Sequence, residues 1–276
     1  MYQYVRNDLY YGVLLRPRLR ARHRKLLASA VRRDSHTYTA FHRSPAQLDA
    51  LVHPVVDHVR RTNAGPLRIL IFAGSNGAEA YTFASQLTHV RPEITLSLVA
   101  SDLHQAMVDK AVSATYTLAE ITQGLDVPAE FIARTFDRDG DRYVVKPALR
   151  RITSFEQADL LDPTLSARFG VADVVAAQNV LFHLPPALAR DAFARVVAHV
   201  RPGGVLMLDG MELDMRVELT RAAGLVPMAY RLRDIYEYSR RHIPENWWDL
   251  YYGNEPYSRF ARHRRHRYGT LFLKPS

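Results

Sequence analysis

The sequence predicts an α/β fold in which a doubly wound, mostly parallel β-sheet is covered by helices. Short apolar runs alternate along the chain with stretches of helical periodicity. The strands are expected at residues 67–73, 95–100, 171–177 and 205–208, and the helices at 78–87, 105–112 and 185–200. Short buried strands that alternate with helices are typical of parallel βαβ units.

Composition limits the class of protein. The 276 residues are 47% hydrophobic and 24% charged, which is ordinary for a globular protein with one large core and a small accessory domain. The absence of cysteine excludes disulfides, thiolate metal sites and cysteine nucleophiles, and no metal site is expected. No run approaches about 18 apolar residues and no signal-peptide pattern opens the chain, so we expect a cytoplasmic protein without a membrane span.

The net charge of +9 is unevenly distributed along the chain. Residues 1–62 carry 12 basic and 4 acidic side chains, and residues 231–276 carry 10 and 5. Basic ends around an acidic centre indicate an anionic partner, such as an acidic protein, nucleic acid or phosphate. A solvated basic helix face explains the pattern equally well.

Two helices are expected before the first strand. Residues 16–33 place leucines among basic residues at roughly helical spacing, and residues 48–59 carry an apolar stripe. Asn-Ala-Gly-Pro at 63–66 then interrupts the pattern. We therefore predict a basic helical N-terminal domain over 1–62 and an α/β domain over 63–276.

The ends of the first two strands carry the residues of a nucleoside site. The first strand leads into Gly74-Ser-Asn-Gly77, and the second ends at Asp102, whose carboxylate suits a ribose diol. The turn is neither G-x-G-x-x-G nor a P-loop, so a dinucleotide or a triphosphate lacks its usual cradle. Glu79 would repel phosphate but could receive a sulfonium or an amino group. The cofactor that fits is S-adenosylmethionine.

The segment AGSNGAEAYT at 73–82 resembles A-A-S-T-G-E-E-P-Y-S of the CheR-type methyltransferases. Further segments match that family in order and approximate spacing, from about residue 37 to 204. They are TYTAFHR at 37–43, ASD at 100–102, ADLL at 158–161 and QNVLFH at 178–183. The resemblance implies a class I methyltransferase fold, which is Rossmann-like, with a small N-terminal helical domain.

The resemblance also implies roles for individual residues. Arg43 would hold the carboxylate of S-adenosylmethionine near the transferred methyl, Glu79 would meet the amino acid end and Asp102 the ribose. The remaining cofactor contacts would come from Thr37, Thr39, Gly74, Gly77, Asp159, Leu160, Gln178 and Asn179. Each of these residues also has a purely structural alternative. Asp102 could cap the next helix, Thr37 and Thr39 could be loop residues, and Arg43 could be a surface charge.

Two departures from the family concern the methyl acceptor. Gln178 stands where the family has arginine, and His183 stands where it has tyrosine. Because an arginine fork is the natural clamp for a carboxylate, its loss disfavours glutamate side chains as acceptors. His183 is the candidate catalytic base, and Arg43 is the second candidate catalytic residue. Alternatively, His183 is a hydrogen-bonded structural histidine.

Two segments bear on the choice of substrate. Residues 136–143 occupy the place of a small β-hairpin that some family members use to dock a receptor tail, and we expect them to keep only a turn. Residues 230–260 form an aromatic insertion with nine aromatic side chains, ahead of a final strand at 268–273. These aromatics could form a lid over the acceptor pocket or a core beneath a long insertion.

Three functions follow. The preferred one is a CheR-like, S-adenosylmethionine-dependent methyltransferase that acts on a small molecule, or uses S-adenosylmethionine itself as substrate, and releases S-adenosylhomocysteine. The first alternative is a protein glutamate carboxyl O-methyltransferase of a chemotaxis-like system. The second is a non-catalytic regulator that binds the cofactor or a nucleic acid. A small-molecule partner is expected over a protein, with a possible acidic partner at the basic N-terminal domain.

Overall fold

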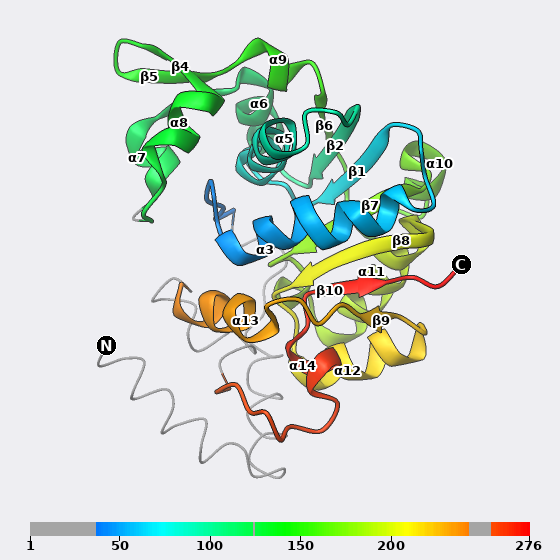
Figure 1. The fold of residues 1–276 in the computed structure, drawn as a ribbon. Helices are drawn as coiled ribbons and strands as arrows, with labels where there is room; N and C mark the ends of the chain where they lie inside the picture. The colour runs from blue at the N-terminus through cyan, green and yellow to red at the C-terminus, as the bar shows by residue number, and fades with distance from the viewer. Residues whose placement is uncertain (1–36, 124, 243–254) are drawn as a thin grey trace.

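The computed structural model describes residues 37–123, 125–242 and 255–276. Their main feature is a seven-stranded sheet in the order β6-β2-β1-β7-β8-β10-β9 (Figure 1). The strands are β1 (Leu67–Phe72), β2 (Leu96–Asp102), β6 (Thr153–Gln157), β7 (Ala172–Gln178), β8 (Val200–Asp209), β9 (Val226–Pro227) and β10 (Leu271–Leu273). The first five strands in the spatial order pair in parallel, and β10 runs antiparallel to both neighbours. The predicted doubly wound α/β fold is confirmed.

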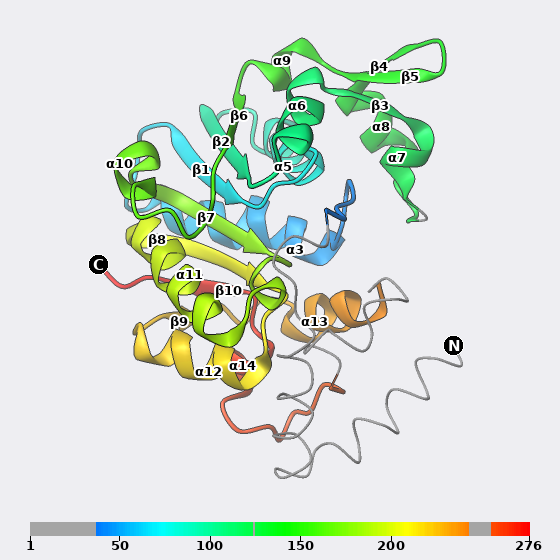
Figure 2. The same ribbon diagram turned by 180° about the vertical axis from the view of Figure 1, so that it is seen from behind.

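Helices cover both faces of this sheet (Figures 1 and 2). Alternate residues of β1 enter different cores: Ile69 and Ile71 pack with α5, whereas Leu70 and Phe72 pack with α11. The helices around the sheet are α5 (Ala78–Val90), α6 (Gln105–Ser113), α10 (Leu165–Phe169), α11 (Pro186–His199), α12 (Leu213–Ala222), α13 (Leu232–Arg241) and α14 (Arg264–Tyr268). The predicted helices near 78–87, 105–112 and 185–200 are thus confirmed.

The apolar stripe at 48–59 lies on one continuous helical segment. It consists of α3 (Pro45–Ala50), a π-helical turn η1 (Leu51–Val55) and α4 (Val56–Arg60). Pro54 lies inside the π turn, the kind of local widening that accommodates a residue without an amide proton. The stripe is buried in the same core as Ile69 and Ile71. The domain boundary near residue 62 stays a prediction, and the helix expected at 16–33 lies outside the described residues.

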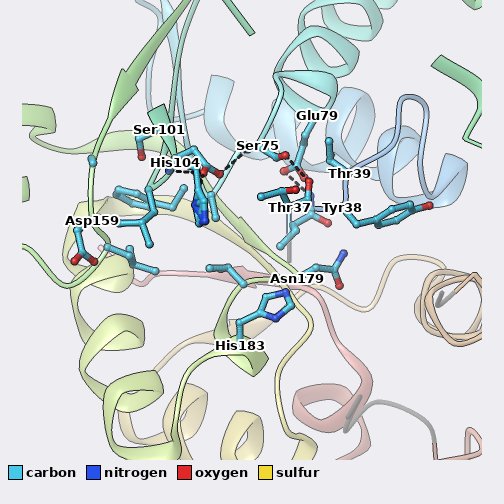
Figure 3. A pocket seen from close by; sticks show the side chains of 18 of the residues that line it. Thr37, Tyr38, Thr39, Ser75, Glu79, Ser101, His104, Asp159, Asn179 and His183 are labelled. Atoms are coloured by element: carbon cyan, nitrogen blue, oxygen red, sulfur yellow. Dashed lines mark hydrogen bonds and ion pairs between the residues drawn. The ribbon is translucent and has the colours of Figure 1, made fainter. Parts of the chain in front are cut away.

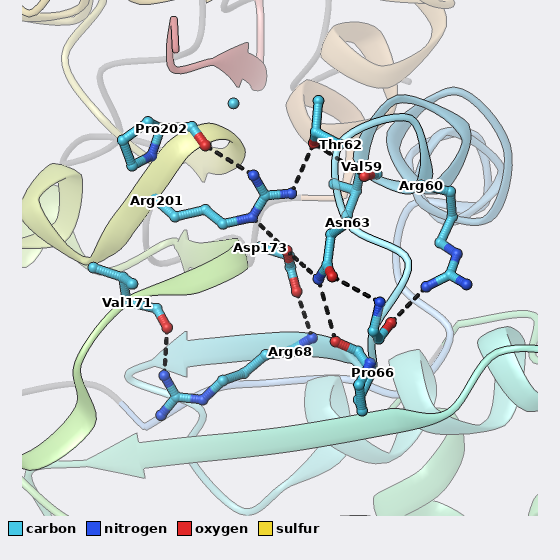
Figure 4. Close-up of polar contacts among 12 residues, drawn as sticks. Val59, Arg60, Thr62, Asn63, Pro66, Arg68, Val171, Asp173, Arg201 and Pro202 are labelled. Atoms are coloured by element: carbon cyan, nitrogen blue, oxygen red, sulfur yellow. Dashed lines mark hydrogen bonds and ion pairs between the residues drawn. The ribbon is translucent and has the colours of Figure 1, made fainter.

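A polar network fixes the chain where the helical segment leads into β1 (Figure 4). The buried Asp173 carboxylate accepts hydrogen bonds from the Arg68 backbone at 2.8 Å, the Asn63 side chain at 2.9 Å and Arg201 Nε at 2.5 Å. Arg201 also donates to the Thr62 hydroxyl at 3.0 Å. Asp173 is 3% exposed, so its carboxylate has little contact with water. These donors replace the hydrogen bonds to water that it loses on burial.

The expectation that residues 136–143 keep only a turn is wrong. They form most of a hairpin, β4 (Phe136–Asp139) and β5 (Arg142–Val145), which joins β3 (Thr115–Thr117) in a second, antiparallel sheet of order β3-β5-β4. Gly140 takes φ +60° in the two-residue connection. The buried Phe136 ring packs 5.2 Å from Phe41 and 6.1 Å from Tyr116, which anchors the strands despite their charged tip.

The short helices α7 (Leu118–Thr122) and α8 (Ala129–Thr135) contact this small sheet, and α9 (Pro147–Arg150) contacts α5 and β6. Figure 1 shows the β4–β5 hairpin projecting at one end of the molecule.

The C-terminal part differs from expectation in two ways. The final strand is shorter than 268–273, because Tyr268 ends α14 and its side chain is buried. The described part of the aromatic insertion contains α13, and it builds a small core around Tyr236, Tyr257 and Tyr268. Trp247, Trp248, Tyr251 and Tyr252 lie outside the described residues. Within the described ranges, no helix has the length and apolarity to cross a membrane.

Candidate active site

A pocket of about 880 Å³, counted with its opening to solvent, lies at the carboxyl ends of β1, β2 and β7 (Figure 3). It brings together every residue predicted for the site except Gly74 and Gly77. Its wall also contains residues that were not predicted for the site, several of them direct neighbours of the motifs: Tyr38, Phe72, Ala73, Ser75, Ser101, Leu103, His104, Ala158, Leu161, Val180 and Leu184.

The two glycines shape the turn from behind rather than lining the pocket. Gly77 begins α5 with φ +87°, and a Cβ there would lie 2.9 Å from the Cβ of Ala111. Gly74 donates its N–H to the carbonyl of Ser101 at 2.9 Å. This tight path brings Ser75 into the pocket wall, where its hydroxyl donates to the carbonyl of Thr37 at 2.6 Å.

Asp102 ends β2 and is almost fully buried, with 9% of the residue exposed. One oxygen accepts the Ser75 N–H at 2.8 Å and the other accepts the His104 N–H at 3.0 Å. Asp102 does not cap the next helix, because His104 holds the N-cap position of α6. A carboxylate offers about four lone-pair positions, so this side chain can also accept the two hydroxyls of a ribose.

Glu79 lies at the centre of a charged cluster in the same pocket. Arg43 donates to one carboxylate oxygen at 3.0 Å, and the Gln178 amide donates to the other at 3.1 Å. With its amide oxygen turned toward the guanidinium, Asn179 accepts from Arg43 Nη1 at 2.6 Å. Burial raises the pKa of Glu79, while Arg43 and the Gln178 hydrogen bond lower it. Arg43 is therefore part of the site and not a solvated surface charge.

Asn179 follows β7 in an unusual backbone conformation, with φ +54°. Its N–H donates to the Asp209 carbonyl at 3.1 Å, at the end of the neighbouring strand. Gly210 makes this approach possible, because a Cβ there would lie 2.5 Å from the Asn179 Cα. The position of Asn179 thus depends on Gly210, which was not among the residues predicted for the site.

The opposite wall is largely apolar. Asp159 turns the chain, accepting the Leu161 N–H at 2.9 Å with its side chain. Leu103, Leu160 and Leu161 line the pocket beside it. An apolar slot flanked by backbone groups suits a purine ring.

His183 ends a short 3₁₀ turn, η2 (Leu181–His183), with its ring 4.0 Å from that of Phe182. Figure 3 shows its imidazole beside Asn179 at the pocket wall. The structure therefore places His183 where an acceptor could reach it, and its role as a base stays a prediction.

The described part of the aromatic insertion lies next to the pocket without lining it. The hydroxyl of Tyr230 donates to Asp49 on α3 at 2.6 Å. Burial raises the pKa of Tyr238, and a hydrogen bond to the backbone of Ser44 and the charge of Arg43 lower it. Helix α13 thus contacts the segment that carries Arg43, while Tyr236 and Tyr257 supply a core rather than a lid.

A comparison with protein families finds that residues 37–222 match the family described as "CheR methyltransferase, SAM binding domain". Chemotaxis protein methyltransferase 1 of Pseudomonas aeruginosa is 30% identical over 63% of this chain and 65% of its own length. Chemotaxis protein methyltransferase 2 of Vibrio cholerae is 26% identical over 65% of this chain and 63% of its own. The chain thus spans about 65% of the length of these relatives.

Solved structures of methyltransferases are also similar. An O-methyltransferase family protein from Burkholderia thailandensis is 19% identical, with a TM-score of 0.38, over 84% of this chain and 60% of its own. An amino pentose methyltransferase from Micromonospora echinaspora, solved with S-adenosylmethionine, is 21% identical, with a TM-score of 0.33, over 58% of this chain and 50% of its own.

The expectation of a small-molecule acceptor in preference to a protein is wrong, because the relatives are named as methyltransferases of chemotaxis proteins. In the structure Gln178 donates to Glu79, inside the charged cluster. Two of the aromatic residues that had favoured a closed pocket, Tyr236 and Tyr257, belong to a separate core.

Proposed function

This chain belongs to the CheR methyltransferase family, and on that premise we propose that it transfers a methyl group from S-adenosylmethionine to a glutamate carboxylate of a protein. The ion pair between Arg43 and Glu79 inside the pocket carries the cofactor part of the proposal. The names of the relatives support the acceptor class.

The residues present fit the cofactor. The methionine end of S-adenosylmethionine is a zwitterion, and the Arg43–Glu79 pair offers a guanidinium for its carboxylate and a carboxylate for its ammonium. Both side chains are largely shielded from water, at 19% and 11% exposure, which strengthens these contacts. Asp102 is free to accept ribose hydroxyls, and the wall of Leu103, Leu160 and Leu161 offers an apolar slot for adenine.

When bound, S-adenosylmethionine supplies a methyl group on a cationic sulfur, which a carboxylate can accept without losing a proton. The chain therefore needs to align the acceptor and exclude water rather than remove a proton. Arg43 contributes positive charge beside the site of reaction, and His183 can orient an acceptor oxygen by a hydrogen bond. His183 is then a binding group for the acceptor and not a base.

The second sheet supports a protein acceptor. It occupies the place of the hairpin that some family members use to dock a receptor tail, and β4 lies at its edge. Edge strands present unpaired backbone groups to which an extended peptide can add.

Methyl transfer is tested with S-adenosylmethionine labelled in the methyl group and a cytoplasmic receptor fragment that contains glutamates. We expect label on the protein that mild base releases as methanol, since methyl esters hydrolyse and N-methyl groups do not. Base-stable label, or no transfer by a chain that binds the cofactor, would contradict the carboxylate acceptor.

Arg43→Ala should raise the dissociation constant of S-adenosylmethionine about 10- to 100-fold, the scale of a charged hydrogen bond. Calorimetric titration measures this change. Arg190→Ala is the matched control, because Arg190 forms an exposed pair with Glu218 and does not line the pocket. Equal affinity in both variants would remove Arg43 from the site.

A further inference from the structure

A group of arginines surrounds one exposed phenylalanine near the C-terminal end. Phe260 is 81% exposed, whereas the other exposed large hydrophobic side chains among the described residues range from 36% to 54%. The exposed arginines, here called the arginine patch, are Arg221 of α12 and, in the segment around α14, Arg259, Arg262, Arg264 and Arg265.

Within the part of the chain that the structure describes, no guanidinium of the arginine patch pairs with a carboxylate. Arg221 contacts the His263 ring at 3.3 Å, and Arg264 donates to the carbonyl of Arg259 at 3.3 Å. The neighbouring Arg267 behaves differently: it is buried and pairs with Glu255 at 2.5 Å and with Asp214. One arginine therefore anchors the segment, while the others present uncompensated charge to solvent.

The local field is positive. The pKa of His263 is lowered mainly by burial, and the charges of Arg221 and Arg262 lower it further. The guanidinium of Arg259 lies over one face of the Phe260 ring, 4.6 Å from the ring centre. Most of the surface of Phe260 stays exposed.

We propose that the arginine patch binds an anionic membrane surface, with Phe260 entering the layer between head groups and acyl chains. Guanidinium groups donate bidentate hydrogen bonds to phosphates, and each basic residue near such a surface adds attraction. An aromatic ring among basic residues is typical of chain segments that lie in the membrane interface. A nucleic acid fits less well, because Arg259 occupies a face on which a base would stack.

This surface is separate from the proposed methyl-transfer site. Figures 1 and 2 both show the segment around α14 at the end of the molecule opposite the β4–β5 hairpin. Membrane contact there would leave the hairpin accessible. The inference therefore goes beyond the proposed function and does not depend on it.

Insertion of residue 260 can be measured cleanly because the sequence contains no cysteine. Phe260→Cys and Val112→Cys are each labelled with an environment-sensitive fluorophore; Val112 is the control, exposed at 54% on α6. Vesicles of phosphatidylcholine with phosphatidylglycerol should raise the emission at position 260 and shift it to shorter wavelength, with no such change at 112. An unchanged signal at 260, or an equal response at 112, would overturn the proposal.

The charge contribution is measured by sedimentation with the same vesicles. Arg262→Ala/Arg265→Ala should weaken binding about 10- to 30-fold, whereas Arg150→Ala/Arg151→Ala, an equal loss of exposed charge at α9, should not. Equal losses in the two double variants would show nonspecific attraction and overturn the proposal. Binding to single-stranded DNA that requires the patch, in a chain that ignores vesicles, would also overturn it.

Discussion

At the level of single residues, Glu79 is a buried carboxyl group whose pKa is shifted by opposing effects: burial raises it, and Arg43 and Gln178 lower it. Its pKa is raised above the ordinary 4.5, mainly by burial. The folded state thus binds this proton more tightly than the unfolded state does, and the contribution of Glu79 to stability falls as pH rises from 4.5 through the folded pKa. Burial therefore favours the protonated form of Glu79 in the folded chain, although the proposed cofactor contact requires the charged form.

Glu79→Gln should accordingly have a melting temperature equal to or above that of the unsubstituted chain at pH 8, with the difference vanishing below about pH 4.5. Its affinity for S-adenosylmethionine should fall about 10- to 100-fold. Thermal melts across pH and calorimetric titration measure the two effects. Glu93→Gln is the control, since Glu93 forms an exposed pair with Arg91. A Glu79→Gln variant that melts lower at pH 8 and binds the cofactor normally would contradict this account.

Gly210 and Gly224 offer a matched test of how the site is held. Both have left-handed φ, at +62° and +65°, but a Cβ would clash with Asn179 at Gly210 and meet nothing within 4 Å at Gly224. Gly224→Ala should cost about 1 kcal/mol of unfolding free energy from backbone strain alone. Gly210→Ala should cost about 2–5 kcal/mol and also weaken cofactor binding. Denaturant melts and titration distinguish them; equal effects would mean that Asn179 can move freely.

At the level of elements, the edge strand β4 gives a test of protein docking. In a hairpin with a two-residue connection the flanking pair, here Asp139 and Arg142, is hydrogen-bonded, so the N–H of Arg138 faces the open edge. Arg138→Pro would remove that donor and Arg138→Ala would keep it. We expect only the proline variant to raise KM for the receptor fragment, with cofactor affinity unchanged in both. Identical KM values in the two variants would exclude backbone pairing at β4.

The elements that the sequence predicted best are those with a continuous apolar pattern. The strand and helix starting near residues 67 and 78 were clear because burial on both faces of the sheet leaves little polar surface. The hairpin was missed because charges at 137–139 and 141–142 hide the few anchoring side chains, above all Phe136. The length of β10 was predicted wrongly because Tyr268 is a buried residue at the end of helix α14. In the sequence, a buried tyrosine at a helix end cannot be distinguished from one in a strand.

At the scale of the whole molecule, the pocket could be predicted where motifs follow the strands and could not where distant segments meet. The positions of Glu79 and Asp102 follow from the sheet topology, since carboxyl ends of parallel strands share one edge. The pairing of Gln178 with Glu79 joins residues 99 positions apart and is invisible in the sequence. The sequence shows that the family's arginine is absent but not which contact the glutamine makes instead.

The position of β10 also has a consequence for how the chain folds during synthesis. β10 pairs with β8 on one side and β9 on the other, yet it follows both in the sequence. Among the described strands of this sheet, β9 pairs only with β10. The edge of β8 that β10 will cover therefore stays open on the ribosome until residue 273 has left the exit tunnel. The backbone groups of β8 that pair with β10, at 205–207, thus stay unpaired longest in the nascent chain, and a chaperone that binds extended apolar segments would find this apolar strand there.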